Sequence, residues 1–284
     1  MDKKIKLKGH ESFSIREGWI TKGIFEIKDN PKLFSEKNLT DILGIGTNMV
    51  KSLKYWLITA GVIKEVKKME YELTELGRLI KRYDPYMEDV FSLYFIHLSI
   101  VTNIEKAIVW NIFFNKCNIK NFSKRELLEQ IKYILDTENL EYNEKMLIDE
   151  IPILLKTYTI DDKNDTPENN LTCPLTELKL IRKVDKDVYQ KEKSALNVLN
   201  PYVVYWCMIN QTDSNSINID DLFKGDNSVC KLLNLDKMLL NEYLDILKKE
   251  NLITINRTAG LNMVYINKRY SLEEIFERYF EGEK

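Results

Sequence analysis

The spacing of apolar side chains predicts helices and a hairpin in the first eighty residues. Residues 16–28 place Trp19, Ile20, Ile24 and Ile27 close to the three–four spacing of an amphipathic helix. The same pattern predicts a helix over 39–43, a turn over 44–46, a helix over 47–60, strands over 62–66 and 71–73, and a helix from 74.

This order of elements is that of a winged helix-turn-helix domain, in which the helix after the tight turn enters the DNA major groove. The outward positions of that helix and the hairpin lysines carry amide, hydroxyl and ammonium groups, and we expect nothing acidic to interrupt this face. The expected DNA-binding residues are Asn48, Lys51, Ser52, Lys54, Tyr55, Lys64, Lys67 and Lys68. Winged helices also serve as protein-docking modules, so the fold alone does not decide the function.

The middle of the chain, residues 83–195, is predicted to be mainly helical. Helices are expected over 86–101, 107–114, 123–135 and 143–155. Ser123 and Glu126 stand in capping-box positions. The polar run 161–170 is predicted to be a solvated loop, since it lacks the glycine and the final glutamate of a calcium-binding EF-hand.

The last ninety residues repeat the first order of elements. Helices are expected over 201–209, 227–233, 235–250 and 272–280, with short strands over 216–219, 252–256 and 263–267. The outer face of the helix over 235–250 carries Glu242 and Asp245, which would repel phosphates, so we interpret this second unit as a scaffold or protein-contact surface. The fold class predicted is mainly α with small β-hairpins, with winged-helix units over 1–82 (including an N-terminal arm) and 196–284 flanking a helical middle.

Composition narrows the class of protein. The chain has 284 residues, of which 44% are hydrophobic, so global disorder is excluded. The most apolar stretch, 90–101, is too short to span a membrane, and the N-terminus lacks the apolar segment of a secretory signal. Four cysteines without a CxxC pair predict reduced thiols in a cytoplasmic protein, with no metal site.

Charge is distributed unevenly along the chain. Residues 1–82 carry 17 basic and 11 acidic side chains, a net charge of +6, whereas 83–195 and 196–284 carry −5 and −3. A polyanion such as DNA is therefore expected to meet the N-terminal third, and the acidic remainder is expected to dock partner proteins.

The segment before the first helix holds the candidate catalytic residues His10, Glu11 and Arg16. In phosphodiester cleavage His10 would act as acid or base, Glu11 would bind a metal or a water molecule, and Arg16 would clamp a phosphate. Two other interpretations stay open: the arm is structural, or its lysines contact DNA. The second histidine, His97, lies in an apolar helix and is expected to be a hydrogen-bonded core residue.

Three motifs resemble a bacterial family that was long a domain of unknown function. They are GHESF with Arg16, Gly18 and Trp19; Gly44, Gly46, Asn48, Met49, Val50, Ser52, Leu53 and Trp56; and Cys173-Pro174-Leu175 with Leu178 and Leu180. Genes of this family tend to lie beside PAPS-reductase-like genes in DNA phosphorothioation clusters. Its best-studied members are similar to the Ssp-type B component, which is associated with DNA nicking.

The resemblance implies a DNA-binding accessory protein of phosphorothioate modification and phage defence, with nicking as a possible activity. DNA and other proteins of such a cluster are the expected partners. A divalent metal is expected only if the protein is a nickase. The alternative is a non-enzymatic winged-helix regulator or a protein-docking scaffold.

Overall fold

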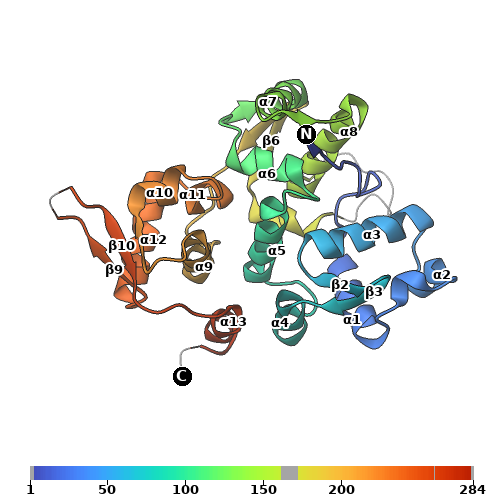
Figure 1. Ribbon diagram of the computed structural model, residues 1–284, viewed down its shortest axis with the longest axis horizontal. Helices are drawn as coiled ribbons and strands as arrows, with labels where there is room; N and C mark the ends of the chain where they lie inside the picture. Colours follow the sequence, from blue (N-terminus) through green and yellow to red (C-terminus); the bar gives the residue numbers. More distant parts are fainter. Residues whose placement is uncertain (1–2, 161–171, 259, 283–284) are drawn as a thin grey trace. The chain divides into compact units, whose positions relative to one another are not determined.

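The described part of the chain is mainly helical, with short strands in small sheets (Figure 1). This computed structural model describes residues 3–160, 172–258 and 260–282, so the polar run 161–170 lies outside the described residues. The chain separates into two units, Met1–Glu192 and Lys193–Lys284. The division into three domains at 82 and 195 stays a prediction. Within the described ranges no helix has both the length and the apolar character needed to cross a bilayer.

The predicted elements of the first eighty residues are present. They are α1 (Trp19–Asp29), α2 (Leu39–Leu43), α3 (Thr47–Thr59), β2 (Ile63–Lys67), β3 (Glu70–Leu73) and α4 (Glu75–Tyr83). A short 3-10 helix, η1 (Leu33–Ser35), was not predicted. Helix α1 begins at Trp19 rather than at 16, because Gly18 has a φ of 75° that a helix cannot continue through. Strands β2 and β3 pair antiparallel, and the Thr74 hydroxyl caps α4 by accepting from the Gly77 amide.

The middle helices were also predicted, with changed starts. They are α5 (Val90–Thr102), α6 (Ile108–Asn115), α7 (Lys124–Thr137) and α8 (Glu144–Tyr158). The capping box of Ser123 and Glu126 is confirmed. The prediction that the first of these helices starts at 86 is wrong, because Asp89 caps α5 and the preceding residues form a turn in which Met87 has a φ of 57°.

A three-stranded sheet in this region was not predicted. It comprises β4 (Asn121–Phe122), β6 (Ile181–Asp185) and β7 (Val188–Lys191), in the order β4-β7-β6. The 3-10 helix η3 (Pro174–Leu178) precedes β6. A register shift between Lys183 and Asp185 interrupts the alternation of buried and exposed positions in β6, which weakens the sequence signal for a strand.

The described residues of the second unit contain one helix more than predicted. Its elements are α9 (Pro201–Gln211), β8 (Ser216–Asn218), α10 (Ile219–Lys224), α11 (Val229–Leu232), α12 (Lys237–Lys249), β9 (Ile253–Asn256), β10 (Met263–Ile266) and α13 (Leu272–Glu281). Helix α10 was missed because it is only six residues long and follows β8 directly, with Asn218 as its cap. The strands form a sheet in the order β8-β10-β9, and Ser271 with Glu274 makes a capping box at α13.

Candidate functional site

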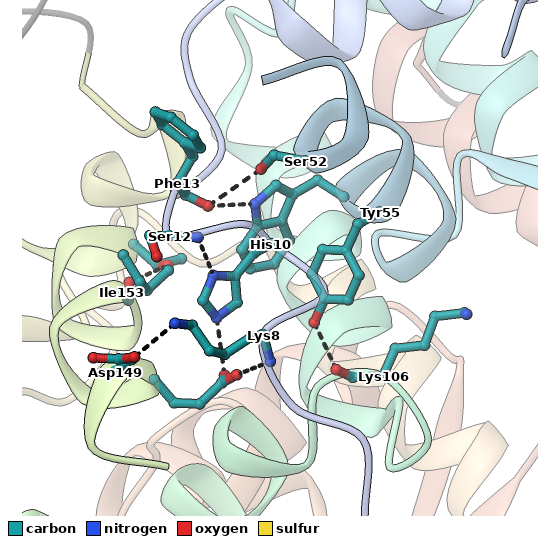
Figure 2. Close-up of polar contacts among 12 residues, drawn as sticks. Lys8, His10, Ser12, Phe13, Ser52, Tyr55, Lys106, Asp149 and Ile153 are labelled. Carbon is teal, nitrogen blue, oxygen red and sulfur yellow. Dashed lines mark hydrogen bonds and ion pairs between the residues drawn. The ribbon is translucent and has the colours of Figure 1, made fainter. Parts of the chain in front are cut away.

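The N-terminal arm runs between α3 and α8 of the first unit. Strand β1 (Lys3–Lys4) pairs in parallel with β5 (Leu140–Glu141), and the Ile5 amide donates to the Glu141 carbonyl at 3.0 Å. Further along, the Lys8 amide donates to the Glu150 carboxylate, and Lys8 Nζ lies 2.6 Å from Asp149 Oδ2 (Figure 2). Two neighbouring carboxylates of α8, Asp149 and Glu150, therefore hold the arm in place.

His10 is completely buried in this arrangement. Its ring stacks on Trp56, and its centre lies 5.9 Å from the centre of the Trp110 ring in an edge-to-face arrangement. Its Nδ1 accepts from the Ser12 amide at 3.2 Å (Figure 2), so a neutral ring carries its proton on Nε2. Nε2 lies 3.1 Å from Glu150 Oε2 and faces a carboxylate whose side chain is only 4% exposed. This burial closes His10 to any substrate that approaches from solvent.

The Phe13 carbonyl ties the same arm to α3. It accepts from Trp56 Nε1 at 2.8 Å and from the Ser52 hydroxyl at 3.5 Å (Figure 2). Ser52 is fully buried, so the prediction that it points outward is wrong. The reason is that the arm covers this part of α3, and a pattern read from the helix alone contains no information on that cover.

The outward face of α3 is smaller than predicted. Asn48 and Lys51 are exposed, and Lys51 Nζ lies 4.0 Å from Glu11 Oε1. The Tyr55 hydroxyl donates to the Lys106 carbonyl at 2.6 Å, and burial raises the pKa of Tyr55 far above its ordinary value. Tyr55 therefore bonds to the protein rather than pointing freely outward.

Lys54 and the β2–β3 hairpin supply the remaining predicted residues. Lys54 Nζ lies 4.8 Å from the centre of the Tyr71 ring, a cation–π distance. Lys67 and Lys68 are exposed at the hairpin, whereas Lys64 forms a 3.0 Å ion pair with Glu72.

Acidic side chains do interrupt the hairpin face, contrary to the prediction. Glu72 lies beside Lys64, and the exposed Glu65 accepts from the Met69 amide at the turn. Helix α3 itself contains no acidic residue. The basic surface is thus centred on the N-terminal part of α3 and the tip of the hairpin.

Arg16 is half-buried and has different neighbours from the His10–Glu150 pair. Its guanidinium stands over the Phe13 ring at 5.3 Å and approaches Met49 Sδ at 4.0 Å. It lines a pocket of about 380 Å³ together with residues of the loop before α5 and of η3. The Glu17 amide donates to the Thr172 carbonyl at 3.1 Å, so the first and third sequence motifs meet at this pocket.

The three candidate catalytic side chains thus have three different surroundings. His10 faces Glu150, Glu11 faces Lys51, and Arg16 lies against aromatic rings. Among the described residues, no three His, Cys, Asp or Glu side chains gather in a way that could hold a metal ion. His97 is confirmed as a core residue, with Nδ1 2.7 Å from the Tyr158 hydroxyl.

Sequence reasoning missed Glu150, although a signal for it exists. Glu150 follows Leu147 by three positions and precedes Leu154 by four, so it occupies the apolar stripe of α8. A carboxylate on such a stripe requires a buried partner. The structure supplies that partner as His10, from a segment 140 residues away in the sequence.

Comparisons with known proteins found solved structures that have a similar fold. Two solved structures share it: the magnesium ion-bound SspB crystal structure, with a TM-score of 0.83 and 17% sequence identity, and the SspB crystal structure, with 0.82 and 18%. Each match covers 98% of this chain and 88% of the other chain. At 17% and 18% sequence identity, this similarity shows a shared fold alone. No curated protein matches the chain.

The family model for the protein of unknown function DUF4007 matches residues 7–280. The chain therefore belongs to the DUF4007 family.

Proposed function

We propose that this protein contacts DNA as an accessory component of bacterial DNA phosphorothioate modification and phage defence. Family membership and the shared fold with SspB support this assignment. The observation that carries it is the N-terminal face of α3, where Asn48 and Lys51 are exposed on a helix without acidic residues. Amide and ammonium groups there suit base edges and phosphates.

In this proposal α1 to β3 act as a winged helix-turn-helix unit, with α3 as the recognition helix and the β2–β3 hairpin as the wing. Lys67 and Lys68 at the hairpin would contact phosphates beside the groove. The arm would hold α3 in position, because the Phe13 carbonyl accepts hydrogen bonds from Trp56 and Ser52 on the inner side of this helix.

The salt dependence of duplex binding tests this interface. Fluorescence anisotropy with a labelled duplex of about 20 base pairs, at several salt concentrations, gives the slope of log K against log salt. Lys51→Ala and the double variant Lys67→Ala, Lys68→Ala are expected to lower the slope by about one for each phosphate that the protein no longer neutralises. Lys145→Ala, an exposed lysine on α8, is the matched control. Equal slopes in all variants would place DNA elsewhere or favour a protein-docking scaffold.

DNA nicking is the finer part of the proposal. Glu11 and Arg16 are the candidate groups with access to solvent, whereas His10 is enclosed. Supercoiled plasmid incubated with and without Mg²⁺ or Mn²⁺ tests this activity. Loss of nicking in Glu11→Gln, Arg16→Ala with retained duplex affinity would assign chemistry to the arm. Absence of nicking in the wild type would leave a recognition subunit.

A further inference from the structure

Two exposed aromatic side chains border the pocket that contains Arg16. Tyr86 lines the pocket and is 66% exposed, and the Phe25 ring lies 6.3 Å from it with an exposure of 39%. Aromatic side chains that are open to solvent provide flat surfaces on which a nucleobase can stack. We call this pocket with its aromatic border the Tyr86 pocket.

Lysines surround the aromatic pair on its outer side. Lys81 Nζ lies 5.0 Å above the Phe25 ring, and Lys28 lies close enough to act on Lys81. Burial and the like charge of Lys28 lower the pKa of Lys81, with Asp29 opposing them. An anion beside the two lysines would relieve their repulsion. The border of the pocket thus offers stacking surfaces next to sites for phosphate.

The pocket itself carries more negative than positive side chains, unlike its border, which carries lysines. Apolar side chains such as Met87 and Leu93 line it together with the carboxylates of Glu17, Glu88 and Glu177. Arg16 also lines the pocket, with its guanidinium over the Phe13 ring, and the three carboxylates outnumber it. The net negative charge disfavours a phosphate, whereas an exocyclic amino group would donate hydrogen bonds to the carboxylates. The volume of about 380 Å³ falls in the range of small-molecule sites and accommodates a single planar base.

We propose that the Tyr86 pocket receives one unpaired, amino-bearing base of a DNA strand, stacked against Tyr86, while the adjoining phosphates lie at Lys81 and Lys28. This inference rests on the proposed DNA contact. The approach of Arg16 to Met49, next to Asn48 on α3, connects the pocket to the proposed duplex surface. An unpaired base next to a bound duplex would reach the pocket from that edge.

Cytosine and thymine provide a matched pair of ligands, because they have the same ring size but differ in an amino group against a carbonyl at position 4. We would measure the binding of labelled dC8 and dT8 by anisotropy at pH 8 and low salt, using the full chain. The wild type is expected to bind dC8 at least about fivefold more tightly than dT8. Equal affinity for the two oligonucleotides would overturn the proposal.

Variants separate stacking from base recognition. Tyr86→Ala is expected to lose roughly tenfold in affinity for dC8, Tyr86→Phe to retain it, and Tyr133→Ala, a similarly exposed tyrosine on α7, to leave it unchanged. Glu88→Gln with Glu177→Gln is expected to bring the dC8 to dT8 ratio close to one. Unchanged dC8 affinity in Tyr86→Ala would overturn the proposal.

The outcomes for the pocket and for the duplex surface are distinguishable. Salt-dependent duplex binding that responds to Lys51→Ala, together with equal dC8 and dT8 affinities, would remove the pocket assignment alone. Absence of binding to both duplex and single strands would remove both proposals.

Discussion

His10 Nε2 and Glu150 Oε2 lie 3.1 Å apart in the interior of the first unit, joining the N-terminal arm to α8. Glu150 also accepts the Lys8 amide, and the His10 ring stacks on Trp56 of α3. Lys8, Glu11 and Ser12 have positive φ angles, a backbone conformation that non-glycine residues adopt at a cost. The contacts of His10 and Glu150 hold this strained segment between two helices.

Removal of one member of the His10–Glu150 pair is therefore expected to destabilise the fold. His10→Ala removes the imidazole that faces the buried Glu150 carboxylate and, among the described residues, leaves this carboxylate only the Lys8 amide, which costs about 3 kcal/mol in the free energy of unfolding. Asp149 lies on the same helix, and Asp149→Asn removes only its exposed ion pair with Lys8. This substitution is expected to cost under about 1 kcal/mol. Urea denaturation of both variants measures the difference. If the wild type nicks DNA and His10→Ala keeps wild-type stability but does not nick DNA, His10 would be reassigned to a catalytic role.

Close approach of the arm to α3 makes Gly9 a second sensitive position. A Cβ at Gly9 would lie 2.4 Å from the Tyr55 ring, whose hydroxyl is bonded to the Lys106 carbonyl. Gly9→Ala is expected to cost about 1–3 kcal/mol through overpacking. Gly46→Ala meets nothing within 4 Å and is the control. If denaturation gives the two variants equal stability, the arm has room to move away from Tyr55.

The periodic elements could be predicted from the sequence because their signals are local. Helices α2 and α3 and the β2–β3 hairpin follow from apolar spacing, from Gly44 and from a charged turn. The β4-β7-β6 sheet escaped prediction because β4 is two residues long and pairs with a strand some seventy residues later. Pairing at such a separation depends on tertiary packing, which a local pattern does not encode.

The candidate site was predicted only in part, for a similar reason. The arm was identified by its dense run of histidine, glutamate, arginine and tryptophan, yet the cover that it provides over Ser52 became visible only in three dimensions. Tyr86 was assigned to a helix because it borders an apolar stretch. In the structure Tyr86 lies in a turn and lines the same pocket as η3, which comes about ninety residues later in the sequence.

All four cysteines are buried, and this predicts unreactive thiols in the native state. Burial raises the pKa of Cys117, Cys173 and Cys230 to about 12 and raises that of Cys207 as well. Because the thiolate is the reactive form, almost none is present at pH 8. Labelling with DTNB is expected to proceed only as the protein unfolds in urea. Rapid labelling of one thiol without denaturant would reveal local opening around that cysteine.

The second unit is expected to take no part in duplex binding. The exposed face of α12 carries Asp245 beside Lys248 and Lys249, and Asn241 is occupied by a hydrogen bond from Arg257. Carboxylates on this face oppose phosphate contact, so Lys248→Ala with Lys249→Ala should leave the salt slope of duplex binding unchanged. Lys51→Ala measured alongside serves as the positive control, since it is expected to lower the slope. A lower slope in the α12 variant, with the Lys51 variant unaffected, would move the DNA surface to the second unit.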